Sequence, residues 1–191
     1  LAMWNGNLAG PQVEPGEYQV LLKVGAAERR ALVEVRPDPR ASAAEHHAQF
    51  VFLTEVVAKL DAVHEALARA RHLRGELRTL ESRAPAGDAL VAWKKQSEEL
   101  RTRIDRLERA LCQPDSKSAQ DPLNFPVGLN DRLAALNNAS GGFGPTAQDL
   151  AVRDELFAAI ETPLRELGAL LDTDAAALLK TAREIGVPIL R

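Results

Sequence analysis

The chain has 191 residues and is poor in the residue types that mark disulfide-rich, membrane-spanning or β-rich proteins. Cys112 is the only cysteine, so no disulfide can form within the chain. No apolar run approaches the about 20 residues that a bilayer-spanning helix needs. Aromatic residues make up only 4%, and the net charge is −3. Without such a run we expect no membrane insertion. We also expect no nucleic-acid partner, because a small negative net charge gives little attraction to a polyanion.

The residues that are abundant favour helices. Hydrophobic residues make up 46% of the chain and charged residues 27%, which is the balance of an ordinary globular protein. Alanine, leucine, arginine and glutamate, all good helix formers, dominate the sequence after its first forty residues. The length is enough for a substantial hydrophobic core.

A β-hairpin is predicted near the N-terminus, with strands at 18–24 and 31–36. Both segments alternate apolar and polar side chains, as strands with one buried face do. One predicted face of the first strand carries Tyr18, Val20, Leu22 and Val24. A hairpin alone is marginal in water, and the chain starts at Leu1 rather than at a methionine. We therefore expect residues 1–40 to be the end of a β module, with a proline-rich linker, whose other strands lie upstream in a larger protein.

Residues 41–191 are predicted to form a helical bundle, with helices at about 42–83, 88–112, 127–138 and 146–185. Ser42 and Glu45 have the spacing of a capping box at the start of the first helix. Its core-facing seam is predicted at Phe50, Leu53, Val57, Leu60, His64 and Leu67, and then at Ala70, Leu73, Leu77 and Leu80.

The second helix has the most regular apolar pattern in the chain. Its seam repeats in alternating steps of three and four through Leu90, Trp93, Ser97, Leu100, Ile104, Leu107 and Leu111. Asp88 is predicted as its N-cap. The link to the first helix is short, so the two helices should run antiparallel. A loop with three prolines at 112–126 should separate this helix from a shorter one with Leu129, Leu133 and Leu136 on its buried face.

The last helical segment should begin at Thr146 as N-cap. Its buried face is predicted at Leu150, Phe157, Ile160, Leu164, Leu167 and Leu171, followed by Leu178, Ala182 and Ile185. Pro163 should kink this segment, and Asp172–Asp174 is either a second break or a polar part of the helix. The predicted fold is therefore mainly α, a long antiparallel bundle of three layers whose middle layer is broken, preceded by a β-hairpin.

No catalytic residue, cofactor-binding residue or metal ligand is predicted from the sequence, and no cofactor is expected. His46, His47 and His64 are the candidate residues for a metal site. Neighbouring helical residues point about 100° apart, so His46 and His47 cannot bind one ion without a third group. The arginine-rich segment 69–83 is interleaved with glutamates, which indicates a solvated helix face. Cys112 ends an amphipathic helix and is expected to be a buried, unreactive thiol.

Three short segments together resemble a known family. They are Gly10–Val20 with Val35–Arg40, then Asp121–Pro126 continuing through Leu129–Leu133, and Gly144–Gln148. The first resembles an Ig-like strand pair. In this order the three resemble the C-terminal region of large bacterial Asp-box (BNR-repeat) β-propeller proteins, which are sortilin-like and glycosyl hydrolase-like. None of the three segments is catalytic, so no functional residue is carried over.

The resemblance implies that any hydrolysis or ligand binding belongs to an upstream propeller, and it favours a location outside the cytoplasm. The leading hypothesis is a noncatalytic C-terminal module with a structural or interaction role. Its expected partners are the upstream propeller of the same protein or a second copy, joined through the hairpin or the helical seam. The alternative hypothesis is a bundle that binds a small ligand or a metal through His46, His47 and His64.

Overall fold

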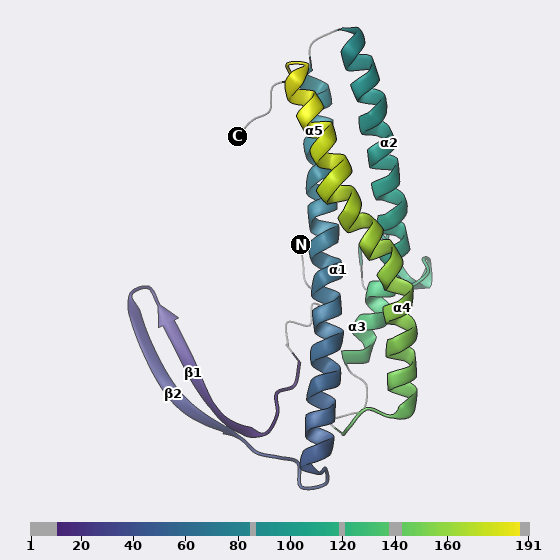
Figure 1. Ribbon diagram of the computed structural model, residues 1–191. Helices are drawn as coiled ribbons and strands as arrows, with labels where there is room; N and C mark the ends of the chain where they lie inside the picture. The colour runs from purple at the N-terminus through teal and green to yellow at the C-terminus, as the bar shows by residue number, and fades with distance from the viewer. Residues whose placement is uncertain (1–10, 85–86, 119–120, 138–142, 188–191) are drawn as a thin grey trace.

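A β-hairpin and a helical bundle make up the fold seen in a computed structural model (Figure 1). The structure describes residues 11–84, 87–118, 121–137 and 143–187. The hairpin consists of β1 (Gly16–Val24) and β2 (Ala27–Val35). It projects to one side of the long first helix, α1, rather than lying along the bundle (Figure 1). The prediction of a mainly helical bundle preceded by a hairpin is confirmed.

The hairpin is tighter than the sequence predicts. Val24 pairs with Ala27, so only Gly25 and Ala26 form the loop. Gly25 has φ of +57°, a conformation that glycine adopts without the steric cost of a Cβ atom. The return strand therefore begins at Ala27 instead of residue 31. The predicted apolar face is confirmed at Tyr18 and Val20, which pair with Val33 and Ala31, because directly paired residues lie on the same side. Leu22 pairs instead with the charged Arg29.

Helix α1 (Ala43–Arg83) has 41 residues and is roughly 60 Å long. The predicted capping box is confirmed: the Ser42 hydroxyl accepts a hydrogen bond from the Glu45 amide, and the Glu45 carboxylate accepts one from the Ser42 amide. The glutamate's pKa is lowered by this bond from the Ser42 backbone. The capping box fixes where α1 begins and hence where the hairpin is attached.

The seam predicted for the first half of α1 is partly wrong. Phe50 and Val57 are only half-buried, and His64 is exposed. The buried positions are instead Gln49, Phe52, Leu53, Val56, Leu60, Val63, Ala66 and Leu67. This part of α1 contacts both α3 and α4, so its buried face is wider than a two-helix seam. From Ala70 to Leu80 the prediction is confirmed.

Helix α2 (Asp88–Leu111) buries every residue of its predicted seam. The N-cap prediction is wrong by one position. Gly87 is the N-cap and makes no side-chain cap, while Asp88 is the first residue of the helix. Its carboxylate still favours the start of the helix through the helix dipole. Pro85 and Ala86 of the predicted link lie outside the described residues.

Shorter elements complete the middle layer. A 3-10 turn at Asp121–Leu123 interrupts the proline-containing loop, and α3 (Leu129–Ala135) follows it. Leu133 and Leu136 are buried, as predicted, but Leu129 is only half-buried, and the helix begins there instead of at residue 127. Gly128 packs so close to the end of α2 that an added Cβ would lie 2.9 Å from the Cys112 Cα atom. Asn138, the predicted end of this helix, lies outside the described residues.

The last layer consists of α4 (Ala147–Ala169), a π-helical turn (Leu170–Asp174) and α5 (Ala175–Glu184). Thr146 caps α4 as predicted. Helical structure continues through Pro163, and the segment changes direction part-way along its length (Figure 1). The π-turn shows that Asp172–Asp174 is a local change of helix type. The face prediction is wrong at Leu150, which is exposed, and Leu156, which was not predicted, is buried. Three further predicted positions are only half-buried: Phe157, Leu164 and Ile185.

These three layers run antiparallel along one another (Figure 1). α1 extends along one side, α2 and α3 return, and α4 with α5 runs back up. α2 contacts α1, α4 and α5, which places its seam at the centre of the bundle. Whether residues 1–40 belong to an Ig-like sandwich and form a domain separate from 41–191 stays a prediction.

Candidate functional site

The most conspicuous surface is one face of the hairpin. We call it the apolar hairpin face and define it by Tyr18, Val20, Leu22, Val24, Ala31 and Val33; Arg29, which pairs with Leu22, adds one charged side chain to the same face. Its large side chains lie in water: Leu22 is 60% and Val24 66% exposed. A contiguous exposed apolar patch of this kind marks an interaction site more often than scattered single residues do. The helices of the same chain do not cover it, so this face is not buried by packing on its own bundle.

The opposite face of the hairpin is polar and internally paired. Glu28 accepts hydrogen bonds from Arg30 at 2.8 and 2.6 Å, and Lys23 lies 3.9 Å from the same carboxylate. Arg30 also donates to the Gln19 side chain at 3.2 Å. Only Leu21 and Leu32 interrupt this polar surface. The hairpin is therefore amphipathic, with one face suited to water and the other suited to burial against an apolar surface.

Polar contacts hold the base of the hairpin against the bundle. The Tyr18 hydroxyl donates to the Glu14 carbonyl at 2.7 Å, and the Glu14 carboxylate lies 2.7 Å from Nδ1 of His47. On the other side, Arg40 binds Asp38 and lies over the Phe143 ring. The hydrogen bond from Arg40 holds the pKa of the Asp38 carboxyl well below its usual range. The Glu14–His47 contact connects the hairpin to the start of α1, and the Arg40–Phe143 contact connects it to the segment before α4.

The three histidines tested from the sequence are not brought together. His47 is exposed and contacts Glu14, and His64 is exposed on α1. His46 is half-buried beside a cavity of about 510 Å³ between the hairpin base and α1. His46 and His64 are eighteen residues apart on one helix, about 27 Å along its axis. They cannot share one ion, and no group of three or more metal-binding side chains occurs among the described residues.

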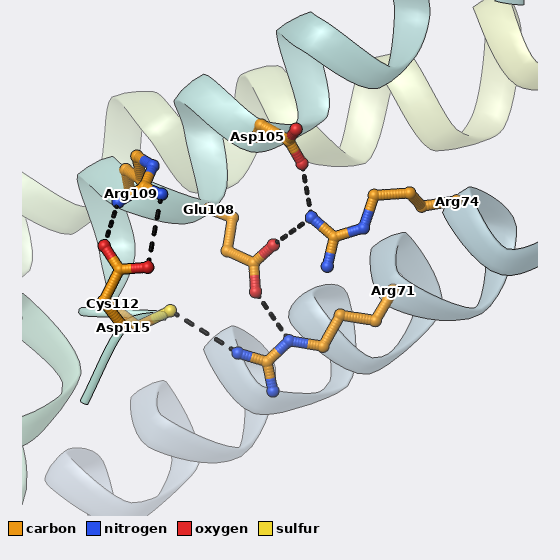
Figure 2. Close-up of polar contacts among 7 residues, drawn as sticks. All are labelled: Arg71, Arg74, Asp105, Glu108, Arg109, Cys112 and Asp115. Atoms are coloured by element: carbon orange, nitrogen blue, oxygen red, sulfur yellow. Dashed lines mark hydrogen bonds and ion pairs between the residues drawn. The ribbon is translucent and has the colours of Figure 1, made fainter. Parts of the chain in front are cut away.

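A second polar cluster lies between α1 and α2 and was not predicted. Figure 2 shows Glu108 of α2 pointing toward Arg71 and Arg74 of α1. The Glu108 side chain is only 2% exposed and accepts from Arg71 at 2.6 Å and from Arg74 at 2.8 Å. Arg74 also binds Asp105 (Figure 2). We call these four residues the arginine–glutamate cluster.

The cluster corrects the interpretation of the arginine-rich segment. Residues 69–83 are not simply a solvated face, because Arg74 is largely covered and neutralises a buried carboxylate. Burial lowers the pKa of Arg74, but its bond to Asp105 and the charge of Glu108 outweigh this and raise the pKa. Its surroundings thus keep the guanidinium charged. The sequence signal was Glu108 itself, an acidic residue directly beside the seam position Leu107.

Cys112 lies at the edge of this cluster and is buried, as predicted. An Arg71 nitrogen lies 3.7 Å from its sulfur. Burial raises the pKa of the thiol, and the nearby Glu108 charge acts in the same direction. The thiol form is therefore favoured over the reactive thiolate. The arginine–glutamate cluster as a whole neutralises the buried charge of Glu108 and joins α1 to α2.

Within the described ranges, none of the helices combines the length and the apolar character needed to cross a bilayer. Comparison with protein-family models, curated proteins and solved structures finds no match to this chain. The apolar hairpin face is therefore the feature of the structure on which a function can be argued.

Proposed function

We propose that this chain is a noncatalytic C-terminal structural and interaction module of a larger protein, of the bacterial Asp-box propeller type that its sequence resembles. The observation that carries the proposal is the apolar hairpin face, which is held out from the bundle and exposed. A monomeric protein rarely leaves an ordered apolar sheet face uncovered unless another surface packs on it.

The bundle provides a stiff support for the hairpin. α1 has a complete capping box, and ion pairs join the layers along its length. Lys59 lies 2.9 Å from Glu161 of α4, and Arg153 of α4 lies 2.7 Å from Glu55. The contacts at Glu14, His47 and Arg40 then connect this support to the hairpin. A rigid support lowers the entropic cost of presenting the hairpin to a partner.

The partner that we propose is a β-sheet of the same parent protein. Two antiparallel strands with one polar and one apolar face have the pattern of half of a β-sandwich. In a sandwich the apolar faces of two sheets pack together, and the polar faces remain in water. The apolar hairpin face would pack on the upstream Ig-like sheet, while the face with Glu28 and Arg30 would stay exposed.

Cysteine labelling tests this packing with two matched positions. In the 191-residue chain, Leu22→Cys and Leu32→Cys should react with a thiol reagent at similar rates, because these leucines are 60% and 76% exposed on opposite faces. In the parent protein Leu22→Cys should react at least about tenfold more slowly than in the 191-residue chain, since about 1.4 kcal/mol of packing free energy already gives tenfold protection.

Leu32→Cys should react equally in the chain and in the parent, and unsubstituted protein gives the background from buried Cys112. Equal labelling of Leu22→Cys in chain and parent would show that the apolar hairpin face is not covered, and the proposed packing would be wrong.

The noncatalytic assignment has its own test. The 191-residue chain is expected to show no turnover above the buffer blank on panels of glycosidase and peptidase substrates. Turnover counts as intrinsic only if a point substitution within the chain abolishes it while the helical circular dichroism is retained. Such a result would overturn the noncatalytic assignment.

A further inference from the structure

The free edge of β1, the strand that lies nearer to α1 in Figure 1, offers a second, separate surface. In the described part of the chain the sheet has two strands, so each strand has one edge without a neighbour. Val24 and Ala27 close the two-residue loop and form a hydrogen-bonded pair. Because pairing alternates along an antiparallel ladder, Glu17, Gln19, Leu21 and Lys23 direct their backbone N–H and C=O groups to the free edge.

We propose that a second copy of this chain pairs antiparallel along this edge, β1 against β1, with Val20 opposite Val20 of the second copy. This inference rests on the proposed function only in taking the hairpin as the element that makes contacts. In this register Glu17 lies opposite Lys23 of the second copy, and Gln19 lies opposite Leu21. All four of these residues point their backbone N–H and C=O groups to the free edge of β1. The register therefore satisfies the hydrogen-bond alternation of a regular antiparallel ladder.

The charges of β1 are self-complementary in this register. Two-fold symmetry brings Glu17 opposite Lys23 twice, once at each end of the new ladder. Opposite charges at directly paired positions stabilise a sheet, and like charges destabilise it. Within its own hairpin Glu17 is opposite Glu34, an unfavourable pair. The lysine of the second copy would compensate this repulsion from the other side.

The edge of β2 is not self-complementary in the corresponding register. The equivalent symmetric register of β2 places Ala31 opposite Ala31 of the second copy. Glu28 would then lie opposite Glu34 twice, so like charges would meet at both ends. Charges that repel along an exposed edge are a common device against strand pairing. In this register the two edges therefore differ, and we take β1 as the edge that pairs. A β2 register with Leu32 opposite Leu32 would place Arg30 opposite Glu34, and the Glu34→Lys variant below distinguishes the two edges.

The resulting sheet would have the order β2–β1–β1–β2. Its polar residues except Arg29 would share one face, and Tyr18 would lie opposite Leu22 of the second copy on the other. The two apolar hairpin faces would join into one continuous surface without being covered. Pairing along the edge therefore leaves the faces free for the sheet of the parent protein.

Sedimentation of the 191-residue chain over a range of concentrations tests the pairing. The unsubstituted chain should show a monomer–dimer equilibrium. Glu17→Lys should weaken the dimer about tenfold or more, because two attractive pairs become repulsive. The same change places a lysine opposite Glu34, so the hairpin itself should gain stability. Weaker association with a retained hairpin cannot be explained by unfolding.

Two further samples make the test specific. Glu34→Lys reverses the same charge on the other strand and should weaken the dimer far less than Glu17→Lys does, because the Glu17–Lys23 pairs between the copies remain. The double variant Glu17→Lys/Lys23→Glu exchanges the charges and should restore dimerisation that Glu17→Lys has lost. A chain that stays monomeric throughout, or a dimer weakened equally by Glu34→Lys, would overturn the proposed pairing. Neither result affects the labelling test of the apolar hairpin face, so failure of this inference is distinguishable from failure of the proposed function.

Discussion

Replacing Ile104 with alanine is expected to lower the free energy of unfolding by about 2–5 kcal/mol. Ile104 is fully buried near the middle of α2, the helix that contacts α1, α4 and α5. The cavity left by the missing atoms would be surrounded on several sides by other helices, so the bundle could collapse into it only in part. Urea denaturation followed by helical circular dichroism measures the loss directly.

Two substitutions on the same helix serve as controls. Val91 is 69% exposed, and Val91→Ala should change stability by less than about 0.5 kcal/mol. Ser97→Ala removes a buried hydroxyl that donates to Glu81 at 2.6 Å, but Glu81 keeps Arg101 at 3.1 Å. We expect a cost of about 0.5–1.5 kcal/mol there. If Ile104→Ala unfolded at the same urea concentration as Val91→Ala, the central position of the α2 seam would be wrong.

The accuracy of the sequence prediction depended on how unambiguous each apolar pattern is. In α2 every seam step except Ser97 carries an apolar residue, and apart from Val91 the neighbours are polar or small, so a single register fits. In α1 the runs Phe50–Leu53 and Val56–Val57 contain adjacent apolar residues, and two registers fit equally well. Contacts with both α3 and α4 select the buried set, and contacts between distant segments cannot be read from the spacing within one helix.

The apolar hairpin face and the arginine–glutamate cluster also differ in how far the sequence could predict them. The apolar hairpin face could be predicted because strand alternation is a local property of the sequence. Its exposure could not, since that depends on whether the helices fold back over it. The arginine–glutamate cluster was missed because its pairs join residues more than thirty positions apart. Arg71 and Arg74 have glutamates close to them in the sequence, but in the structure both pair with Glu108 of the next helix.

Removing both arginines that contact Glu108 is expected to cost about 3–5 kcal/mol of unfolding free energy, the usual range for a buried charge that has lost its partners. The double variant Arg71→Met/Arg74→Met keeps most of the aliphatic volume but leaves the carboxylate without a guanidinium. Glu108 is 2% exposed, so water could not easily replace the lost bonds. Each single substitution should cost clearly less, because the other arginine still reaches the carboxylate.

The matched control is the triple variant with Glu108→Leu added to the two methionines. Burying apolar residues in place of a whole ion pair is often neutral or stabilising, so the triple variant should recover to within about 1 kcal/mol of the parent. This recovery separates an unpaired charge from a simple loss of packing, since the triple variant lacks both arginines as well. If the double variant were as stable as the parent, Glu108 would have another partner or access to water, and the cluster would not join α1 to α2 as described. If the triple variant failed to recover, the arginine side chains would stabilise the bundle through their packing instead of through their charge.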